Sequence, residues 1–428
     1  MTDRRVVAPV LRRVTFGPTA AEVDAAVAAG LAATVARLMR PAASPARPDL
    51  GPDPLAALPP HAGRDARRQA RAAAREQIAT ATWWWLGRMY AGGAAEKLAF
   101  FWHGHWATSV QKVRSAHLML GQQQTFRRYG HDDTAPLVRA MLRDPALILW
   151  LDGQRNTARA PNENLARELM ELFTLGAGSY AEDDVKAAAR ALTGWRVDRA
   201  AGTARFVPRR HDGSAVTLLG WTGPADADTL ADLLVRHPAH VPFLARRIWA
   251  RYGSDDPIPP ATAQRMAAAG HDVTAMLTAL CTDPALPDSA GHLVKQPVEW
   301  MAGALRQLGA DPGRLTAGHR RTVLGGLRAL GQVPFRPPSV GGWPAGPAWL
   351  TTGSAQARLR LGQALAALGP AAVDELAQSP RADRIDTLGR LLVVDGWTGR
   401  TRAVLAGATG EPRRLLALGL ASPEYAVQ

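Results

Sequence analysis

The apolar residues of this chain recur mostly every three to four positions, which is the period of an amphipathic α-helix. The pattern changes at residues 195–207, where two short β-prone segments flank a turn that contains Gly202. Helical spacing returns at about residue 225 and continues to the C-terminus, apart from a Pro- and Gly-rich loop at 333–347. The sequence therefore predicts a mainly α fold, a large array of helices with one small β-hairpin.

Local signals divide the chain into four stretches. Residues 1–40 carry short helices, and a capping-box pattern that begins at Thr19 opens one of them. Residues 41–63 are rich in Pro and Ala without periodicity and are expected to form a linker. A helical core is predicted at 64–252, followed by a C-terminal helical region at 253–428.

A long Ala- and Arg-rich helix is expected at 64–90, ending before two glycines. It contains Trp83, Trp84 and Trp85 in succession, and three consecutive residues cover most of the circumference of a helix. We therefore expect this triplet to be buried on nearly all sides. Further helices are predicted at 94–106, at 112–129, at 162–175 and, from a second capping-box pattern at Ser179 and Glu182, up to residue 192.

The loop at 333–347 holds two large aromatic residues, Phe335 and Trp343, whose apolar surface a solvated loop would leave in water. We expect both rings to pack against the main body, with Arg336 offering its five N–H donors to the irregular backbone. If both rings were exposed, the loop would instead be a contact surface for another protein.

Composition excludes several classes of protein. Of the 428 residues, 47% are hydrophobic and 21% are charged, which is ordinary for a folded protein and rules out wholesale disorder. A disulfide scaffold is excluded because Cys281 is the only cysteine, and its apolar neighbours favour a buried, inert thiol. No apolar run is long enough to span a membrane. The polar N-terminus carries no secretory signal, so the cytoplasm is the default compartment.

The 51 basic and 37 acidic residues give a net charge of +14. Taken alone, this favours a polyanionic partner such as nucleic acid, an anionic membrane surface or an acidic glycan. Only four of the basic residues are lysine, however, and the arginines are spread over the whole chain, which indicates the codon bias of a GC-rich genome. A solvated basic surface is therefore favoured over a dedicated nucleic-acid site.

The same bias makes asparagine informative, because a chain depleted of it should keep it where chemistry or geometry requires it. All three asparagines, Asn156, Asn162 and Asn164, fall within nine residues. Asn164 and Glu168 are four positions apart and share one face of the helix predicted there. We expect Glu168 to be buried against the aromatic segment 102–106, since its stripe is apolar and an unpaired buried carboxylate would be too costly to keep.

Two further motifs contain histidine. His103 and His105 stand among aromatic residues, where neutral imidazole could bind zinc, iron or copper or could be a hydrogen-bonded core group. On a regular helix, residues two apart point nearly opposite ways, so both rings could serve one metal only if Gly104 breaks the helix. His211 and Asp212 follow the predicted hairpin and could be a ligand pair or an Asx turn.

These motifs together suggest a metal-assisted site. The candidate metal ligands are His103, His105, Glu168 and His211, and we expect His103 or His105 to lie within about 5 Å of Glu168 and His211. Glu163 or Glu168 would act as base on metal-bound water, with Asp212 as a further catalytic or ligating carboxylate. Asn162, Asn164 and Arg167 would contact the substrate, although Glu163, Arg167 and Glu171 can equally form a solvated ion-pair ladder.

The motifs resemble those of an uncharacterised bacterial family, domain of unknown function 1800. The segments that carry the resemblance are 11–19, 96–97, 101–109, 160–176, 192–195, 211–213, 295–299 and 335–344. Because it covers nearly the whole chain, the resemblance implies one family-length unit over 1–428. Many members are exported and are encoded beside a second uncharacterised family, domain of unknown function 1501, which implies a protein of that family as a partner. This chain could then leave the cell in complex with a partner that carries the signal.

Two functions remain open. The first is a metal-assisted hydrolase or modifying enzyme acting on an anionic polymer or glycan, a substrate class taken from the charge and from the company of the family. The second is a non-enzymatic partner or scaffold protein whose polar cluster is structural. The metal content of the purified protein would separate them, because only the first requires a divalent metal.

Overall fold

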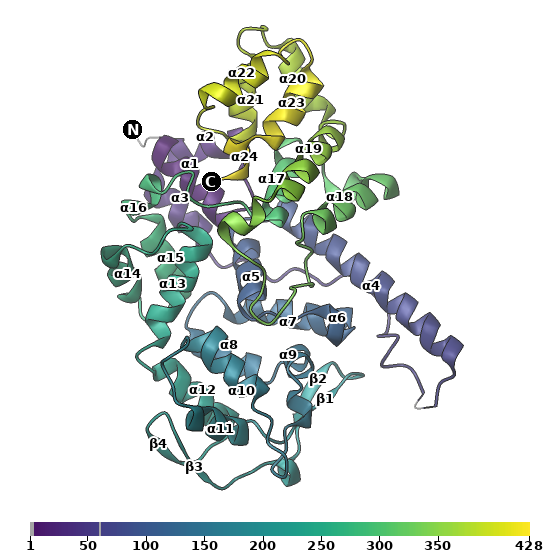
Figure 1. Cartoon of the computed structure of the whole chain (residues 1–428), viewed down its shortest axis with the longest axis vertical. Helices are drawn as coiled ribbons and strands as arrows, with labels where there is room; N and C mark the ends of the chain where they lie inside the picture. Colours follow the sequence, from purple (N-terminus) through teal and green to yellow (C-terminus); the bar gives the residue numbers. More distant parts are fainter. Residues whose placement is uncertain (1–3, 60) are drawn as a thin grey trace.

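The structure, a computed structural model, describes residues 4–59 and 61–428. Over these residues the chain is mainly helical, with 24 α-helices and two separate two-stranded antiparallel sheets (Figure 1). The predicted fold class is therefore confirmed. The molecule is elongated, with the C-terminal helices at one end and the strands at the other. None of the described helices is both long and apolar enough to cross a membrane.

Helices and strands follow one another along the chain with these bounds. The first are α1 (Arg4–Val14), α2 (Ala20–Ala29), α3 (Leu31–Leu38), α4 (Arg64–Ala91), α5 (Ala94–His105), α6 (Val110–Val113), α7 (Ala116–Tyr129), α8 (Thr134–Leu142) and α9 (Pro145–Trp150). Next come α10 (Asn164–Glu168), its π-helical continuation η2 (Leu169–Thr174), α11 (Glu182–Ala191), β1 (Trp195–Asp198), β2 (Thr203–Phe206), β3 (Ala215–Leu218) and β4 (Trp221–Pro224). The remaining helices are α12 (Ala227–Arg236), α13 (His240–Tyr252), α14 (Pro260–Ala267), α15 (Val273–Cys281), α16 (Ala285–Asp288), α17 (Pro297–Gln307), α18 (Ala317–Ala329), α19 (Thr352–Ala366), α20 (Pro370–Gln378), α21 (Arg384–Leu392), α22 (Gly399–Ala406), α23 (Pro412–Ala421) and α24 (Pro423–Ala426).

The local signals at the ends of two helices had different outcomes. At α2 the side chain of Thr19 accepts from the backbone N–H of Glu22 and the Glu22 carboxylate accepts from Thr19, so the predicted capping box is confirmed. At α11 the predicted pair of Ser179 and Glu182 is wrong. There the carboxylate of Asp184 accepts from the backbone N–H of Ala181, which places the start of the helix two residues later.

The predicted hairpin is confirmed, with Trp195 paired to Phe206 and Asp198 to Thr203. A second hairpin, β3–β4, was not predicted. Its two-residue turn is Leu219-Gly220, and both residues have positive φ, 49° and 80°. Two-residue turns of this kind usually contain Asn-Gly or Asp-Gly. Because leucine occupies the first position here, the sequence did not indicate a turn.

The predicted helix at 112–129 is divided in two, because Arg114 adopts a left-handed conformation with φ 56° between α6 and α7. The Trp triplet of α4 is also only partly as expected. Trp85 is fully buried, whereas Trp83 and Trp84 are half-buried. Guanidinium groups cover the faces of these two rings, Arg320 at 5.3 Å from Trp83 and Arg127 at 5.5 Å from Trp84.

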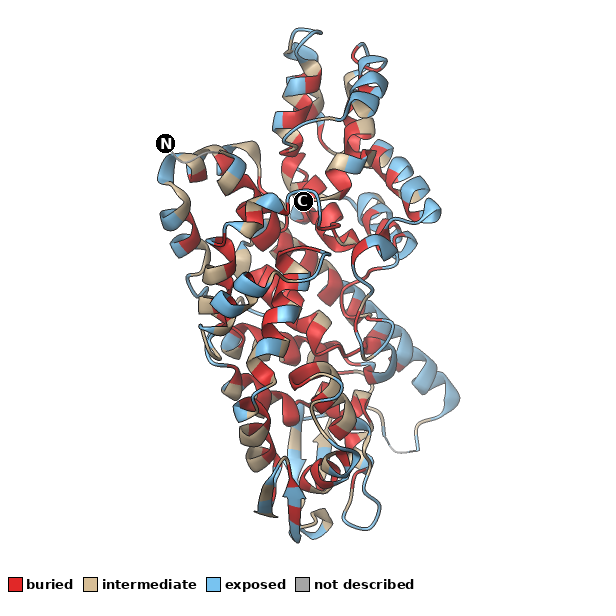
Figure 2. Ribbon diagram, turned by 60° about the vertical axis from the view of Figure 1, so that its left-hand side comes forward, coloured by how far each residue is buried: buried red, intermediate tan, exposed pale blue. Residues whose placement is uncertain are grey.

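Two large apolar cores hold the molecule together, and α5 contributes to both. Figure 2 shows buried residues through the middle of the molecule. Phe101 and Trp102 belong to the core that α8–α15 build, and Phe100 belongs to the core shared by α4, α17 and the C-terminal helices. Cys281 is buried in the first core, where burial raises the pKa of its thiol to about 12, in agreement with an inert cysteine. Helix α5 therefore lies where the two cores meet.

Candidate functional site

Helix α5 continues without a break through Gly104 as far as His105, so its two histidines point to opposite sides. The ring of His103 packs among Trp85, Phe335 and Trp343. Its Nε2 accepts a hydrogen bond from the backbone N–H of Phe335 at 3.0 Å, so in the neutral ring the proton is on Nδ1. Burial lowers the pKa of His103 to about 3, which keeps the ring neutral.

His105 faces the other core and is the opposite tautomer. Its Nε2 lies 2.8 Å from the backbone carbonyl oxygen of Phe173, and because a carbonyl only accepts, Nε2 must carry the proton. Nδ1 therefore presents a lone pair, and this buried atom has no hydrogen-bond partner among the described residues. Burial, together with the charge of Arg247, lowers the pKa of His105 to about 3.

The loop at 333–347 packs onto α5, as predicted. Phe335 is 1% exposed, and Trp343 is half-buried against Phe100 and His103. Gly342 makes the close approach possible, because its φ is 87° and a Cβ there would lie 2.5 Å from the carbonyl oxygen of Gly104. The expected role of Arg336 is not found, since its side chain makes no hydrogen bond to the loop backbone.

His103 is thus the anchor of this loop, and replacing it by Ala should lower the free energy of unfolding by about 2–3 kcal/mol. The change leaves the buried N–H of Phe335 without an acceptor and opens a cavity among aromatic rings. His103→Gln supplies an acceptor at similar reach and should recover part of the loss in a urea unfolding experiment. If Gln recovered nothing and both variants lost a bound metal, His103 would be a ligand instead of an anchor.

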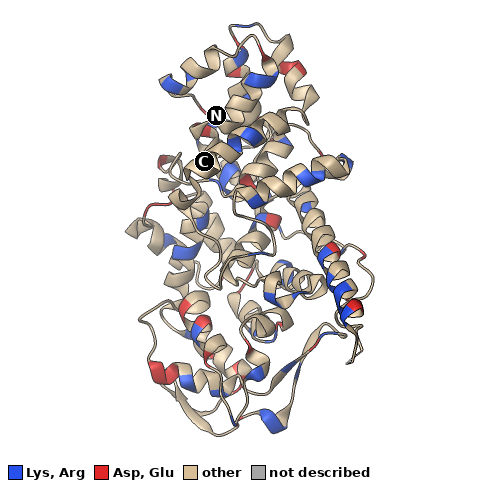
Figure 3. Ribbon diagram, turned by 45° about the vertical axis from the view of Figure 1, so that its right-hand side comes forward, with Lys and Arg blue, Asp and Glu red and all other residues tan. Residues whose placement is uncertain are grey.

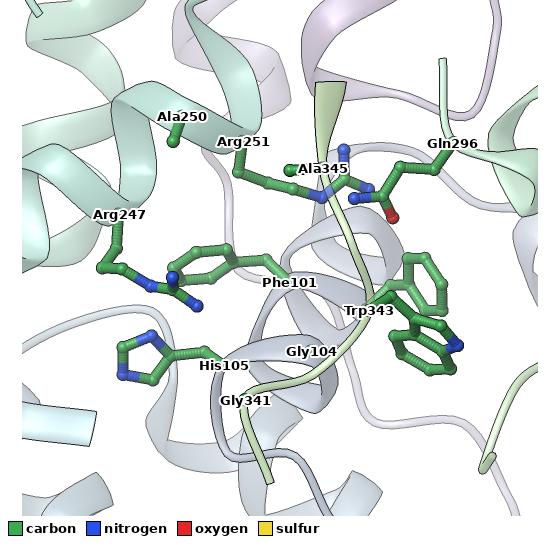
Figure 4. Close-up of a pocket in the computed structure, with 11 residues that line it drawn as sticks. Phe101, Gly104, His105, Arg247, Ala250, Arg251, Gln296, Gly341, Trp343 and Ala345 are labelled. Atoms are coloured by element: carbon green, nitrogen blue, oxygen red, sulfur yellow. The ribbon is translucent and has the colours of Figure 1, made fainter. Parts of the chain in front are cut away.

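A pocket opens where this loop, α5 and α13 meet (Figure 4). Its cavity volume is about 90 Å³. The residues that line it are Phe100, Phe101, Gly104, His105, Arg247, Ala250, Arg251, Gln296, Gly341, Trp343 and Ala345. Two of the polar groups are arginines one helical turn apart on α13, and no acidic residue lines the pocket.

Arg247 is a half-buried charge without a counter-ion among the described residues. It lies beside His105 and Phe101 in Figure 4, and its Nε is buried without a hydrogen-bond partner. It forms no ion pair with any described residue, and burial lowers the pKa of its guanidinium. Since desolvating an unpaired charge is costly, this guanidinium is a strong candidate to receive an anion.

Arg251 is held in place by a buried cluster of charges. Its Nη1 lies 2.7 Å from Glu299 Oε1, and Nζ of Lys97 lies 2.6 Å from the same oxygen. Burial acts to raise the pKa of Glu299, but Arg251 and Lys97 outweigh it and hold that pKa at about 2. Nη2 of Arg251 is buried and unpartnered, so one edge of the guanidinium is still free at the pocket.

The asparagines have a structural explanation. Nδ2 of Asn156 donates to the carbonyl of Ala189 at 2.7 Å, and its Oδ1 accepts from the backbone N–H of Asn162 at 2.9 Å. Oδ1 of Asn162 in turn accepts from the backbone of Asn164, whose Nδ2 donates to the carbonyl of Leu151. These bonds fix the loop before α10 onto α11. The clustering of asparagine indicated a demanding backbone path, and these contacts account for it without a ligand.

The acidic residues of α10 lie closer to solvent than predicted. Arg167 forms ion pairs with Glu163 at 3.1 Å and with Glu182 at 2.5 Å. These contacts agree with a solvated ion-pair group, the alternative to a substrate site. The expected burial of Glu168 is wrong, because its side chain is half-buried. Partial burial and the neighbouring charge of Glu171 raise the pKa of Glu168, and it forms no ion pair among the described residues. The apolar helix face on which Glu168 was predicted to lie ends at this residue. The π-helix η2 begins at Leu169, and its wider turn rotates the residues that follow.

His211 and Asp212 belong to the hairpin region. Nδ1 of His211 lies 3.1 Å from Oγ1 of Thr193, and its ring packs edge-on against Phe206. Arg190 donates to Asp212 at 2.7 Å and, with Ser214, lowers the pKa of that carboxyl. The backbone N–H of Asp212 donates to the same Thr193 hydroxyl. These contacts join β2 to α11. They agree with a structural turn at His211 and Asp212, the alternative to a pair of metal ligands.

The predicted metal ligands are not brought together. Within the described part of the chain, no group of three or more His, Cys, Asp and Glu side chains is placed to hold a metal ion. The expected convergence is therefore wrong for two physical reasons. Helix α5 does not break at Gly104, so His103 and His105 cannot share one ion, and the contact with Thr193 holds His211 beside the end of α11.

The polar residues that do converge are Arg247, Arg251 and Gln296, and none of the three was a predicted site residue. Arginine is so frequent in this chain that two more on a helix carried no signal. Their spacing of four, which puts them on one face between apolar neighbours, was the available clue. Gln296 belongs to the segment 295–299, which meets segments 101–109 and 335–344 at the pocket.

Comparison with protein families matches residues 9–427 to a single description, "Protein of unknown function (DUF1800)". No curated protein and no solved structure matches the chain. The resemblance noted in the sequence is thereby confirmed over almost the entire length.

Proposed function

This chain belongs to the DUF1800 family, whose function is unknown, and we propose from the geometry of its pocket that it binds the anionic group of a ligand beside His105. The observation that carries the proposal is Arg247, whose half-buried guanidinium lines the pocket and has no acidic partner among the described residues. Folding has kept this charge where it is costly, and a bound anion would offset the cost.

The donors favour an oxyanion. Arg247 offers a planar fork of N–H groups, the free edge of Arg251 adds another, and the amide of Gln296 lies beside it in Figure 4. Such a set matches carboxylate, sulfate or phosphate oxygens. At about 90 Å³ the cavity has room for one such group and little more, so the rest of the ligand must lie outside. This supports an anionic polymer or glycan as the ligand class.

In the enzymatic form of the proposal, His105 is the proton carrier. Its Nδ1 lone pair is on the side of Arg247, and the carbonyl of Phe173 fixes the tautomer. With a pKa of about 3, the ring is neutral but a weak base while Arg247 is unpaired. Burial is the larger cause of this low pKa, and an anion that neutralises Arg247 would remove only the smaller effect of the arginine charge. Ligand binding would thus make His105 a somewhat stronger base for hydrolysis or modification of the anionic polymer.

Binding can be tested by thermal unfolding with sodium sulfate and sodium galacturonate, at ionic strength matched with sodium chloride. We expect both anions to raise the Tm of the wild type, by an amount that corresponds to about 2.7 kcal/mol at a hundred times Kd. Arg247→Gln should lose this increment. The matched control is Arg246→Gln, because Arg246 is the exposed neighbour on the same helix and should respond like the wild type.

The control matters because sulfate stabilises most proteins by exclusion from their surface. The proposal predicts a difference between the two variants, beyond this general effect. Equal Tm increments in Arg247→Gln and Arg246→Gln would reject the pocket as an anion site. The scaffold alternative, with a partner of the domain of unknown function 1501 family, would then be the better hypothesis.

A further inference from the structure

A second pocket lies on the other side of the loop at 333–347, between α4 and α6. Its cavity volume is about 330 Å³, which is at the lower end of the range for small-molecule sites. The lining residues are Leu55, Arg71, Ala74, Arg75, Ile78, Val110, Gln111, Arg114 and Arg336. Four of the nine are arginine and none is acidic, so the pocket combines an apolar floor with a strongly positive rim.

These four arginines are available for a ligand. None of them takes part in an ion pair with another described residue, although many arginines elsewhere in the chain do. In the linker, Asp53 precedes the lining residue Leu55 by two positions, and its carboxylate already accepts from the hydroxyl of Ser115 and from the backbone N–H of Leu55. Arg336 is half-buried, and its pKa is lowered by burial and by the charge of Arg328. Mutual repulsion of this kind is relieved when anions bind.

Helix α4 extends the positive surface beyond the pocket. Arg64, Arg68, Arg71 and Arg75 are spaced by four, three and four residues, which puts them on one face. Three turns of helix give this row a length of about 16 Å. Figure 3 shows basic residues along the projecting part of α4, and Figure 2 shows that this part is exposed. A ligand held in the pocket could therefore continue along α4 and meet a new cation at each turn.

We propose that this pocket and the row on α4 bind a polyanionic glycan, whose sulfate or carboxylate groups contact Arg71, Arg75, Arg114 and Arg336. Guanidinium forks match both kinds of oxyanion. No aromatic side chain lines the pocket, whereas sites for single-stranded nucleic acid stack bases on aromatic rings. A sugar ring needs no such platform and can rest on Ala74, Ile78 and Val110. The net charge of +14 would speed the encounter with any polyanion.

The probe for this proposal is fluorescein-labelled dextran sulfate, with binding followed by fluorescence anisotropy. Replacing all four arginines by Gln should weaken binding at least about tenfold and flatten the dependence of affinity on salt, since fewer counterions are released. The triple variant without the Arg336 change alters only exposed side chains and should show most of the loss. This triple variant separates a loss of binding from a loss of folding, and circular dichroism would show whether either variant is misfolded.

The matched control removes the same charge elsewhere. Arg37, Arg360, Arg400 and Arg413 are exposed and form no ion pair among the described residues, so their quadruple Gln variant should bind within about twofold of the wild type. If both quadruple variants lost the same affinity for dextran sulfate, net charge alone would explain the binding and the proposal would be overturned. Undiminished binding in the pocket variant would overturn it too.

Two competitors identify the ligand class. Polygalacturonate and unlabelled dextran sulfate distinguish carboxylate from sulfate recognition, and competition by either supports the proposal. Single-stranded poly-dT of equal charge should compete less well than dextran sulfate. Stronger competition by poly-dT would replace the glycan by a nucleic acid. These measurements do not depend on the pocket beside His105. The Arg247→Gln experiment can therefore reject that pocket as an anion site without affecting the glycan site, and the glycan experiment can fail without affecting the pocket beside His105.

Discussion

Replacing Glu299 by Gln is expected to lower the free energy of unfolding by about 3–5 kcal/mol, because it leaves two buried cations without their counter-ion. Lys97 and Glu299 have side chains that are 0% and 2% exposed, and Arg251 is 11% exposed. Gln keeps the shape of the side chain and removes only the charge. Denaturation by urea, monitored by circular dichroism, measures the effect.

The pH dependence of this variant adds a second readout. Burial lowers the pKa of Lys97 to about 8 even with Glu299 present, from an ordinary value of 10.5, and without Glu299 it should fall further. A lysine whose pKa is lower in the folded state destabilises that state at low pH, and this cost disappears as pH rises toward 10.5. The deficit of Glu299→Gln should therefore narrow between pH 7 and pH 10. Lys295, whose pKa burial lowers to about 7, changes in the same direction.

Glu182→Gln is the matched control, because Glu182 pairs with Arg167 at the surface and its side chain is 57% exposed. Replacing Glu182 should change the free energy of unfolding very little, and this change should not depend on pH above 7. If Glu299→Gln were no more costly than this control, the cluster would not hold Arg251 at the pocket. The anion site would then lose its structural support.

Gly342→Ala is expected to lower the free energy of unfolding by at least about 3 kcal/mol, the sum of a left-handed alanine and a backbone collision. The added Cβ would lie 2.5 Å from the carbonyl oxygen of Gly104, and neither backbone can withdraw without moving the loop or α5. The loop carries Phe335, Trp343 and the wall of the pocket beside His105. We therefore also expect this variant to lose the sulfate-dependent rise in Tm.

The adjacent residue gives a close control. A Cβ at Gly341 would approach only Oγ of Ser339, at 3.7 Å, and its φ is not positive, so Gly341→Ala should be nearly neutral in stability. Thermal unfolding of the two variants, with limited proteolysis of the loop, would compare them directly. Similar stability and equal protection of the loop in both would mean that the loop does not depend on contact with α5.

The local elements of this protein were largely predictable. The period of apolar residues gave the helices, the capping box gave the start of α2, and the turn at Gly202 gave the first hairpin. The loop with Phe335 was correctly expected to pack inward, because an aromatic ring exposed in a loop is unfavourable. Each of these inferences depends on interactions within a few residues, or on the hydrophobic effect alone.

The candidate site was predicted poorly, and the histidines show why. His103 and His105 are both buried, but a shared metal required Gly104 to break α5, and it does not. His211 is held by a contact of its Nδ1 with Thr193, just after α11. Residue type and spacing indicate which side chains can bind a metal. Only the packing of separate elements decides whether they meet.

The sequence by itself determined the helical class, the family and the segments that matter, since these follow from local periodicity and from motifs. Only the tertiary structure decided what those segments do together. It placed Arg247 and Arg251 beside His105 and gathered Arg71, Arg75 and Arg336 around a second pocket. The physical reason is that a charge gains its role from the charges and the solvent around it, and in this chain those neighbours come from residues far apart in sequence.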